Sequence, residues 1–472
     1  MLAEIRGLNE ECGLFGIWGH TEASQLTYYG LHSLQHRGQE GAGMVVTDGQ
    51  VLKSHKAEGL VNEVFNQKII EDMKGRSAIG HVRYATAGGG GVANVQPFLF
   101  NSQTVGSFAL AHNGNLVNAT QLKNQLEIDG SIFHTTSDTE VLAHLIRRSG
   151  SACFKKRIKQ ALSFVQGAYA FLVMTETEMM IAVDPHGLRP VSIGRIGEGY
   201  VAASETCAFD LIGADYIRDV RPGELVTIND DGIQSEYFAE SQGRAMCSME
   251  YIYFSRPDSN IDGINVHTAR KNLGKQLAIE AQIEADVVTG VPDSSISAAI
   301  GYAEVSGIPY EMGLIKNRYV GRTFIQPSQS LREQGVKMKL APVRGVVEGK
   351  RVIMVDDSIV RGTTSRRIVT MLKEAGAKEV HVCISSPPIK NPCFYGIDTS
   401  SKEELIAGFN SVEEIREMIG ADSLTFLSVE GTVEAIGRPF GGEYRGQCMA
   451  CFTGNYPTEI YATDDQAYEK IK

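Results

Sequence analysis

Residues 352–364 read Val352-Ile353-Met354-Val355-Asp356-Asp357-Ser358-Ile359-Val360-Arg361-Gly362-Thr363-Thr364. Four apolar residues, three of them β-branched, lead into two carboxylates, a short polar loop and a helical pattern over 365–377. This order predicts a buried parallel strand, a loop and a helix N-terminus. Ligands bind at the carboxyl ends of such strands. Here that end offers paired acids, which suit a divalent cation or sugar hydroxyls, and backbone N–H groups, which suit a phosphate. We therefore expect a sugar phosphate that carries a metal.

These thirteen residues closely resemble the phosphoribosyl-pyrophosphate (PRPP) signature of type I phosphoribosyltransferases. The resemblance implies that Asp356 and Asp357 hold the ribose hydroxyls and, with Ser294, a Mg²⁺ ion. It implies that PRPP is bound by the acids and the loop after them, that is by Asp356, Asp357, Ser358, Val360, Arg361, Gly362, Thr363 and Thr364. In such enzymes a loop closes over PRPP, and we expect that role for the basic segment 316–326, with Lys316 and Arg322 as PRPP ligands.

The bulk composition limits the class of protein. A length of 472 residues predicts two to three domains. The formal charge of -11 argues against nucleic acid as a partner. No apolar run reaches membrane-spanning length, and the first eleven residues lack the apolar centre of a secretory signal. Eight mostly scattered cysteines suit a reduced protein better than a disulfide scaffold. The sequence therefore predicts a cytoplasmic protein with neither a nucleic-acid nor a membrane partner.

Cys12 opens the apolar stretch Cys12-Gly13-Leu14-Phe15-Gly16-Ile17. A cysteine in such a place is usually a small buried hydrophobe. The alternative is that residues 1–11 are a leader peptide, removed so that Cys12 becomes the mature N-terminus. Its α-amino group, with an ordinary pKa of about 7.7–8.0, could then act as the base for its own thiol. This hypothesis requires removal of the leader, because an amide nitrogen cannot act as that base.

Three later stretches favour the nucleophile. His36-Arg37-Gly38-Gln39 closes a helical segment over 21–36, before a strand over 42–47. A strand over 78–84 precedes Ala85-Thr86-Ala87 and four glycines. Residues 108–116 form an apolar strand that is expected to end in a turn at Asn113-Gly114, although this dipeptide is usually a plain hairpin turn.

Together with Cys12, these stretches resemble the glutamine amidotransferase domain of the N-terminal-nucleophile (Ntn) hydrolase superfamily over residues 12–240. The resemblance implies that Cys12 attacks the side-chain amide of glutamine. It implies that the Asn113 side chain and the Gly114 backbone N–H form the oxyanion hole.

The same resemblance implies three glutamine-binding residues. Arg83 is expected to pair with the α-carboxylate, for which a planar guanidinium is a suitable donor. Asp138 is expected to hold the α-ammonium group, and Arg37 to support the surroundings of the nucleophile.

Secondary-structure patterns divide the chain near residue 240. The pattern over 138–165 is helical, and alternating strands follow it, which predicts an α+β domain for 12–240. The Ntn resemblance implies four layers in the order αββα. Beyond a polar boundary at 235–244, a helix over 268–285 and a strand over 286–291 begin an alternating pattern. This pattern predicts an α/β domain with a mostly parallel sheet for 241–472, the type I phosphoribosyltransferase domain.

The cysteines fall into two groups. Cys153, Cys207 and Cys383 stand among apolar or small residues and are predicted to lie in the core. Four others could form one sulfur site, in which two distant thiols join a C-x-x-C pair: Cys247, Cys393, Cys448 and Cys451. From spacing alone, a pair that binds nothing or does redox work is as good an interpretation. Four sulfur ligands suit either zinc or an iron–sulfur cluster.

The order of the two halves and the cysteines together resemble the amidophosphoribosyltransferase family. The resemblance implies an enzyme that makes 5-phosphoribosylamine, glutamate and pyrophosphate from glutamine, PRPP and water, the first committed step of de novo purine biosynthesis. Ammonia released at Cys12 is expected to pass internally to the PRPP site. The family also implies feedback inhibition by purine nucleotides and a homotetramer. A subset of it carries a [4Fe–4S] cluster on four cysteines in these places.

Two other functions compete with this interpretation. The first is a glutamine amidotransferase with a different sugar-phosphate acceptor, which residues 352–364 disfavour. The second is a PRPP-sensing regulatory protein, which the acidic charge and the complete set of glutaminase residues disfavour.

Overall fold

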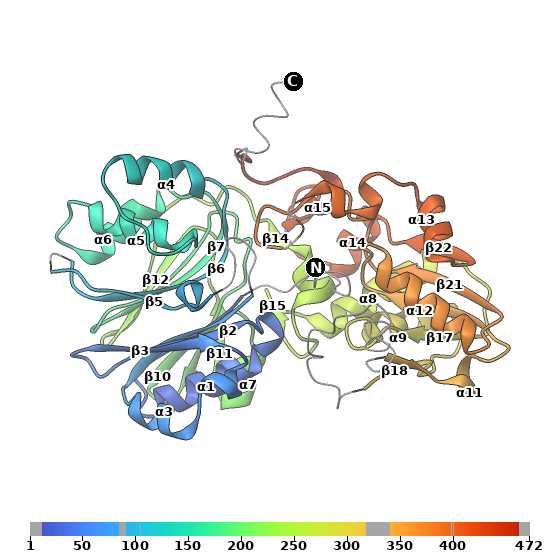
Figure 1. Cartoon of the computed structure of the whole chain (residues 1–472), viewed down its shortest axis with the longest axis horizontal. Helices are drawn as coiled ribbons and strands as arrows, with labels where there is room; N and C mark the ends of the chain where they lie inside the picture. The colour runs from blue at the N-terminus through green and yellow to red at the C-terminus, as the bar shows by residue number, and fades with distance from the viewer. Residues whose placement is uncertain are drawn as a thin grey trace.

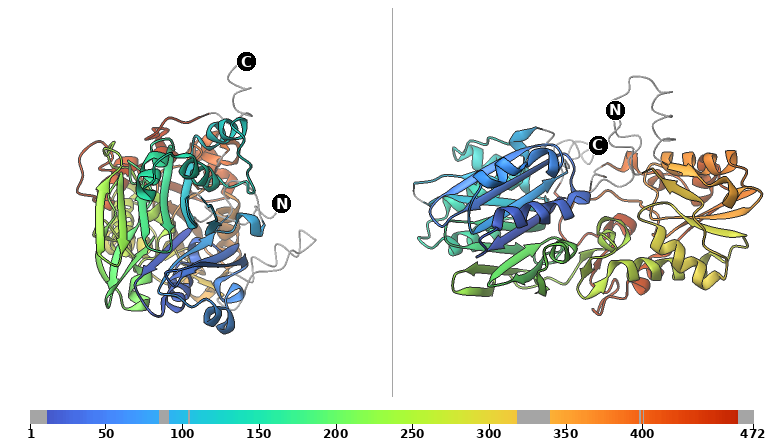
Figure 2. Two further views of the ribbon diagram at one scale, coloured as in Figure 1. Left: turned by 90° about the vertical axis from the view of Figure 1, so that its left-hand side faces the viewer. Right: turned by 90° about the horizontal axis from the view of Figure 1, so that it is seen from below.

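The computed structural model describes residues 12–84, 91–103, 105–317, 340–397, 399 and 401–461. The expected leader, Arg322 and most of the expected PRPP loop lie outside these ranges. Two bodies lie side by side, the N-terminal half up to residue 237 and the C-terminal half from residue 246 (Figures 1 and 2). None of the helices in the described ranges is long and apolar enough to cross a membrane.

The N-terminal half contains two stacked antiparallel sheets. The first has the order β11–β9–β10–β1–β4–β2–β3, and the second has the order β13–β12–β8–β7–β6–β5. The strands of the first are β1 (Gly13–Trp18), β2 (Gly41–Thr47), β3 (Leu52–Glu58), β4 (Ser77–Arg83), β9 (Ser192–Ile196), β10 (Gly199–Ala203) and β11 (Asp215–Asp219). Those of the second are β5 (Phe98–Phe100), β6 (Phe108–Leu116), β7 (Gly167–Met174), β8 (Met179–Val183), β12 (Glu224–Asn229) and β13 (Gly232–Tyr237).

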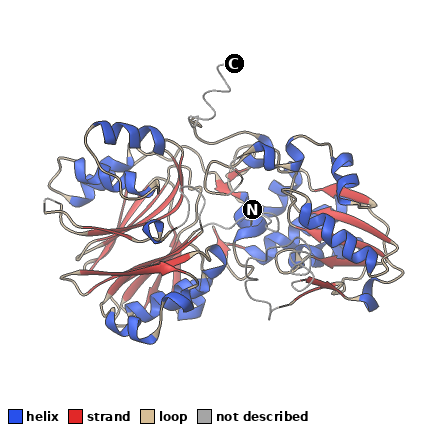
Figure 3. Cartoon of the chain, viewed as in Figure 1, coloured by secondary structure: helices blue, strands red, loops and turns tan. Residues whose placement is uncertain are grey.

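Helices cover the outer face of each sheet (Figure 3). The first sheet carries α1 (Ala23–Ser33), α2 (Val61–Val64), α3 (Gln67–Asp72) and α7 (Cys207–Ile212), and the second carries α4 (Ala119–Ile128), α5 (Thr139–Arg148) and α6 (Phe154–Leu162). Alternation along β1 explains the layering: Phe15 and Ile17 pack toward α1, whereas Leu14 and Trp18 pack between the sheets. The predicted αββα architecture is confirmed.

The C-terminal half is built on a four-stranded parallel sheet in the order β17–β20–β21–β22. Its strands are β17 (Val287–Gly290), β20 (Arg351–Asp356), β21 (Glu379–Ile384) and β22 (Ser423–Phe426). One face is covered by α8 (Val266–Ala281) and α9 (Ile296–Ser306), with α14 (Val429–Ile436) against α8. The other face is covered by α12 (Thr363–Glu374) and α13 (Val412–Ile419). The predicted α/β domain with a parallel sheet is confirmed.

Short elements complete this half. They are β14 (Met246–Cys247), a π-helical turn (Glu250–Phe254), β15 (Asn260–Ile261), β16 (Ile264–Asn265), β18 (Leu314–Lys316), β19 (Leu340–Pro342), α11 (Arg344–Val347), β23 (Gln447–Cys448) and α15 (Ala450–Thr453). The two-residue strands β14 and β23 pair in parallel, and this pairing places Cys247 opposite Cys448.

Three local predictions are wrong. The helical pattern over 138–165 is two helices, α5 and α6, because Ser149-Gly150-Ser151 interrupts it. Asn113-Gly114 is not a turn, since β6 continues to Leu116 and pairs with β7 through both residues. Cys153 is exposed at the start of α6 rather than in the core, whereas Cys207 and Cys383 are buried.

One buried histidine ties the two sheets together and should make stability pH-dependent. His81 of β4 is fully buried, and its Nε2 lies 3.1 Å from the His112 carbonyl oxygen of β6. Burial lowers the pKa of His81 to about 3, with Arg83 acting in the same direction. Because the unfolded chain takes up this proton below about pH 6.5, the folded state loses stability as the pH falls from 6.5 toward 3.

His81→Gln should therefore weaken the acid sensitivity of the fold. Between pH 6.5 and 4.5, the free energy of unfolding should fall less steeply than in the unaltered chain, by up to about 1.4 kcal/mol per pH unit. Urea unfolding at several pH values measures this slope. His134→Gln is the control, because His134 is exposed. Identical slopes for His81→Gln and the unaltered chain would contradict the assignment.

Candidate active sites

The Cys12 thiol lies at the start of β1 and beside the end of β4, two neighbouring strands of the first sheet. Cys12 immediately precedes β1, and Gly13 pairs with Val82 of the neighbouring strand β4. The Cys12 thiol is 3.6 Å from the Tyr84 carbonyl oxygen, just past the end of β4. Cys12 is half-buried, so a small substrate can approach its sulfur.

The two predicted oxyanion donors lie next to each other in β6. Asn113 is 1% exposed, and its side-chain amide nitrogen has no hydrogen-bond partner among the described residues. An unpaired buried N–H₂ group costs free energy, which is typical of a donor held ready for a ligand. The next residue, Gly114, has φ +135°, and a Cβ there would lie 2.1 Å from the Ala168 carbonyl oxygen. Only glycine fits this position without a clash.

Asp138 and Arg83 lie at the same end of the sheets. The Asp138 carboxylate accepts a hydrogen bond from Leu116 N (2.9 Å) and lies 3.6 Å from His112 Nδ1. Burial raises the pKa of Asp138, but His112 and two backbone N–H groups together lower it by more. The pKa of Asp138 therefore lies below its ordinary value. Arg83 ends β4, one residue before Tyr84, and is almost completely buried. Arg83 thus precedes the residue whose carbonyl oxygen contacts the Cys12 thiol, and Asp138 binds the end of β6, the strand that bears Asn113.

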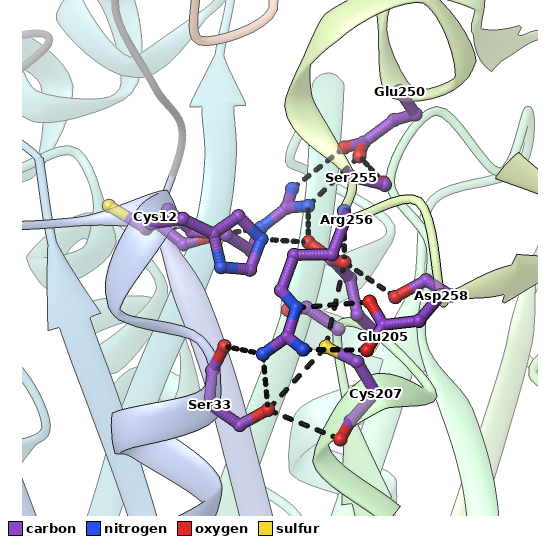
Figure 4. Close-up of polar contacts among 12 residues, drawn as sticks. Cys12, Ser33, Glu205, Cys207, Glu250, Ser255, Arg256 and Asp258 are labelled. Carbon is purple, nitrogen blue, oxygen red and sulfur yellow. Dashed lines mark hydrogen bonds and ion pairs between the residues drawn. The ribbon is translucent and has the colours of Figure 1, made fainter. Parts of the chain in front are cut away.

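Arg37 forms a clamp between the two halves, and Figure 4 shows its partners Cys12, Glu205 and Glu250. Its Nε donates to the Cys12 carbonyl oxygen (3.2 Å). Its other nitrogens bind Glu205 (2.7 Å) and, bidentately, Glu250 of the C-terminal half (2.9 and 2.8 Å). All three side chains are fully buried. The guanidinium is thus committed to the backbone of the nucleophile and to two carboxylates, which agrees with the supporting role expected for Arg37.

The clamp continues on both sides. Glu205 also receives hydrogen bonds from Ser259 Oγ (2.7 Å) and Arg256 N (2.8 Å). Burial raises the pKa of Glu205, but His36 and Arg37 outweigh burial and lower it well below its ordinary value. Sequence reasoning missed Glu205 and Glu250, because no local pattern links them to a residue more than 160 positions away.

The paired acids lie at the carboxyl edge of the parallel sheet. Asp356 ends β20, Asp357 follows it, and both are 7% exposed. The segment after the adjacent strand β17 brings two hydroxyls: Ser294 donates to Asp357 (2.5 Å) and Ser295 to Asp356 (3.0 Å). Burial raises the pKa of both acids, and the Asp357 carboxylate raises that of Asp356 further. The structure therefore brings the three predicted Mg²⁺ ligands together and adds Ser295, which sequence reasoning missed.

A short loop joins these acids to a helix. It leads to α12, and Gly362, with φ +75°, precedes the first turn of that helix. Such a helix N-terminus favours a phosphate. Arg361 pairs with Glu404 (2.6 Å) on one side of the loop. Lys316, across the site at the end of β18, pairs with Asp293 (2.6 Å), the neighbour of Ser294.

The four cysteines of the C-x-x-C set come together. Cys247 and Cys448 face each other across β14 and β23, and with Cys393 and Cys451 they line one small cavity beside Arg189 and Tyr395. Burial raises the pKa of the Cys448 thiol to about 12 and that of Cys451 well above its ordinary value. Among the described residues, no three His, Cys, Asp or Glu side chains are placed to hold a single metal ion.

Comparisons with known proteins place both halves in a family. A profile for the glutamine amidotransferase domain matches residues 66–216, and one for the phosphoribosyl transferase domain matches residues 265–392. An amidophosphoribosyltransferase of Bacillus subtilis is 74% identical over 98% of this chain and 97% of its own length. The chain belongs to the amidophosphoribosyltransferase family.

Other members support the assignment. An amidophosphoribosyltransferase of Staphylococcus aureus is 55% identical over 96% of this chain and 92% of its own length. A solved structure described as the allosteric regulatory enzyme of purine biosynthesis matches with a TM-score of 0.93 and 72% identity, over 96% of this chain and 97% of that one. The Bacillus subtilis glutamine PRPP amidotransferase complexed with ADP and GMP matches with a TM-score of 0.92 and 71% identity, over 98% of this chain and all of that one.

This amidophosphoribosyltransferase-family chain is thus an amidotransferase of purine biosynthesis with a glutaminase half and a phosphoribosyltransferase half. The family and the enzyme class expected from the sequence are confirmed. The competing regulatory and alternative-acceptor functions lose their support. The roles of individual site residues and the boundary near residue 240 stay predictions.

The buried Arg37 clamp should contribute more to the free energy of unfolding than a surface ion pair does. Glu250→Ala should lower the free energy of unfolding by about 3–5 kcal/mol, because it leaves buried Arg37 and Arg189 with one carboxylate fewer. Asp129→Ala, which removes the surface pair with Arg148, should cost less than about 1 kcal/mol. Urea unfolding of both variants is the measurement. Equal losses of unfolding free energy in the two variants would contradict the stabilising role of the clamp.

Proposed function

We propose that this chain divides the amidophosphoribosyltransferase reaction between its two halves, with glutamine cleaved at Cys12 and PRPP aminated at Asp356 and Asp357. The observation that carries the first half is the buried Asn113 amide nitrogen, which has no hydrogen-bond partner among the described residues and stands next to the glycine-only position 114. The half-buried Cys12 thiol of the same half is the proposed nucleophile. The second half is supported by paired acids at a parallel-sheet edge, followed by a helix N-terminus.

The glutaminase step begins once residues 1–11 are removed. The free α-amino group of Cys12 takes the thiol proton, and the thiolate attacks the side-chain carbonyl carbon of glutamine. The negative oxygen that forms is stabilised by the Asn113 amide and the Gly114 N–H. The proton passes to the leaving nitrogen as the C–N bond breaks, which releases ammonia and leaves a γ-glutamyl thioester. Water then displaces the thiolate and gives glutamate. Arg83 and Asp138 fix the α-carboxylate and α-ammonium groups throughout.

The second step joins that ammonia to PRPP. The nitrogen attacks C1 of the ribose, the bond to pyrophosphate breaks, and one proton is lost to give 5-phosphoribosylamine. The ribose hydroxyls bind Asp356 and Asp357, and the loop from Ser358 to Thr364 holds the 5-phosphate at the start of α12. Lys316, at the end of β18, binds the pyrophosphate; the sequence resemblance suggests Arg322, which lies outside the described residues, as a second ligand. Ammonia passes within the protein, because in bulk water near neutral pH most of it would become unreactive ammonium.

A magnesium ion fits the acidic pair. Two adjacent buried carboxylates with raised pKa values and the hydroxyl of Ser294 form an oxygen-rich set that a hard divalent cation would stabilise. Bound there, the ion would neutralise negative charge on pyrophosphate as it leaves.

The test follows glutamate and pyrophosphate together. With glutamine, PRPP and Mg²⁺, the purified protein should release both in equal amounts, each dependent on the other substrate. Cys12→Ala should lose glutamine-dependent turnover by at least about a thousandfold and keep turnover with added ammonia. N-terminal sequencing of the active protein should begin at Cys12. Glutamate release alone, or an active chain that begins at Met1, would overturn the proposal.

We propose further that Cys247, Cys393, Cys448 and Cys451 hold a [4Fe–4S] cluster. Four thiols around one cavity suit it, because thiolates that ligate a cluster stand around its cage rather than around one ion. The cluster takes no part in either reaction and is structural.

Anaerobic purification should therefore give about four iron and four sulfide per chain, with visible absorbance that bleaches in air. Cys448→Ser should lose the iron while Cys153→Ser, at an exposed cysteine, keeps it. Stoichiometric zinc without sulfide would overturn the assignment.

Regulation and location complete the proposal. The relative solved with ADP and GMP supports feedback inhibition of this chain by purine nucleotides. We propose a homotetramer in the cytoplasm, a reducing compartment in which thiols stay reduced.

A further inference from the structure

A hydrogen bond from the C-terminal half reaches the strand that bears the oxyanion donors. The Asn115 side-chain amide donates to the Phe394 carbonyl oxygen (2.9 Å), although the two residues are 279 positions apart in the chain. Asn115 directly follows Gly114 in β6, so this bond acts one residue from the N–H assigned to the oxyanion hole.

The same segment also touches Gly114 itself. A Cβ at Gly396 would lie 3.3 Å and 3.4 Å from the carbonyl carbon and oxygen of Gly114. On its other side, Gly114 is confined by Ala168 of β7. The Gly114 backbone is therefore held between its own sheet and a segment of the phosphoribosyltransferase half. Its positive φ makes it a position where outside support affects the orientation of the N–H.

The supporting segment is itself firmly anchored. The Tyr395 carbonyl oxygen accepts a hydrogen bond from the fully buried Arg189, and Tyr395 N donates to Cys393 Sγ (3.4 Å). The Cys393 N–H in turn donates to the Thr399 carbonyl oxygen (3.1 Å). Bonds on several sides thus fix the Phe394 carbonyl that receives the Asn115 amide.

We propose that residues 393–396 position the oxyanion hole of the glutaminase half, with Asn115 as the positioning residue that links them to Asn113 and Gly114. The proposal rests on the proposed glutaminase role of Cys12. Its physical basis is that the hole must be directed at a negative oxygen that exists only during the reaction. A shift of about 1 Å in such a group costs on the order of a hundredfold in rate. The glutaminase site is accordingly incomplete without the other half.

Asn115→Asp tests the link, because it replaces the donor by a carboxylate that the Phe394 carbonyl repels. The kcat for glutamine should fall about 10- to 100-fold, with the KM for glutamine within about threefold, since Arg83 and Asp138 still bind the substrate. Turnover with added ammonia should stay within about twofold. Asn115→Ala, which adds no charge, is the second variant and should show the same split.

Ligand affinities distinguish a misplaced oxyanion hole from a general disruption of the glutamine site. The γ-semialdehyde of glutamate forms a tetrahedral adduct with a thiol, and its oxygen occupies the hole. Its affinity should fall about as much as kcat in Asn115→Asp, while the affinity for glutamate, which forms no adduct, stays unchanged.

Asn118→Asp is the matched control. Asn118 donates to the Phe164 carbonyl oxygen (2.9 Å) within the N-terminal half and makes no bond to residues 393–396 among the described contacts. It should lower stability without lowering the kcat for glutamine by more than about twofold.

The outcomes discriminate between the two proposals. Full glutamine-dependent kcat in folded Asn115→Asp and Asn115→Ala, or equal losses in Asn118→Asp, would overturn the positioning role and leave the proposed function standing. Undiminished glutamine hydrolysis by Cys12→Ala would overturn the proposed function and the positioning role together.

Discussion

The structure depends on a buried cation shared by its two halves. Arg37 reaches the backbone of Cys12 on one side and Glu205 and Glu250 on the other, with no exposed surface on any of the three side chains. Buried charges are tolerated only when they are paired and hydrogen-bonded. The halves must therefore meet in one arrangement for this set to be neutralised, and that arrangement fixes the nucleophile. Figure 4 shows the hydroxyl and backbone groups that complete the pairing.

The same contact leads toward the PRPP site. The π-helical turn that begins at Glu250 is held by Arg270 of α8, which donates to the carbonyl oxygens of Tyr251 (2.8 Å) and Ser255 (2.7 Å). Burial raises the pKa of Asp357, and the positive charge of Arg270, with the hydroxyls of Ser294 and Ser358, offsets part of that rise. The turn that carries Glu250 is thus attached to α8 through Arg270, a residue whose charge also acts on Asp357.

The sequence was enough to predict structure that is encoded by a few consecutive residues. The strand before Asp356 and Asp357 was predictable because an apolar run, two acids and a glycine-bearing loop stand together, and the structure has β20 and α12 there. The helix break at Gly150 was missed because the apolar periodicity continues on both sides of it. Asn113-Gly114 was interpreted as a turn because its partner strand, β7, lies more than fifty residues away. The contacts of Arg37 with Glu250 and of Asn115 with Phe394 join residues that are far apart in the chain. Such contacts depend on the tertiary fold and produce no local sequence pattern.

Nitrogen freed in one half should be consumed in the other without entering the solvent. This is tested with glutamine labelled with ¹⁵N in its side-chain amide, together with PRPP, Mg²⁺ and unlabelled ammonium at a concentration that exceeds the ammonia released but supports little turnover by itself. The isotope content of the trapped 5-phosphoribosylamine is then measured. The account predicts a product that keeps nearly all the label. A product with the isotope ratio of the ammonium in the buffer would contradict it.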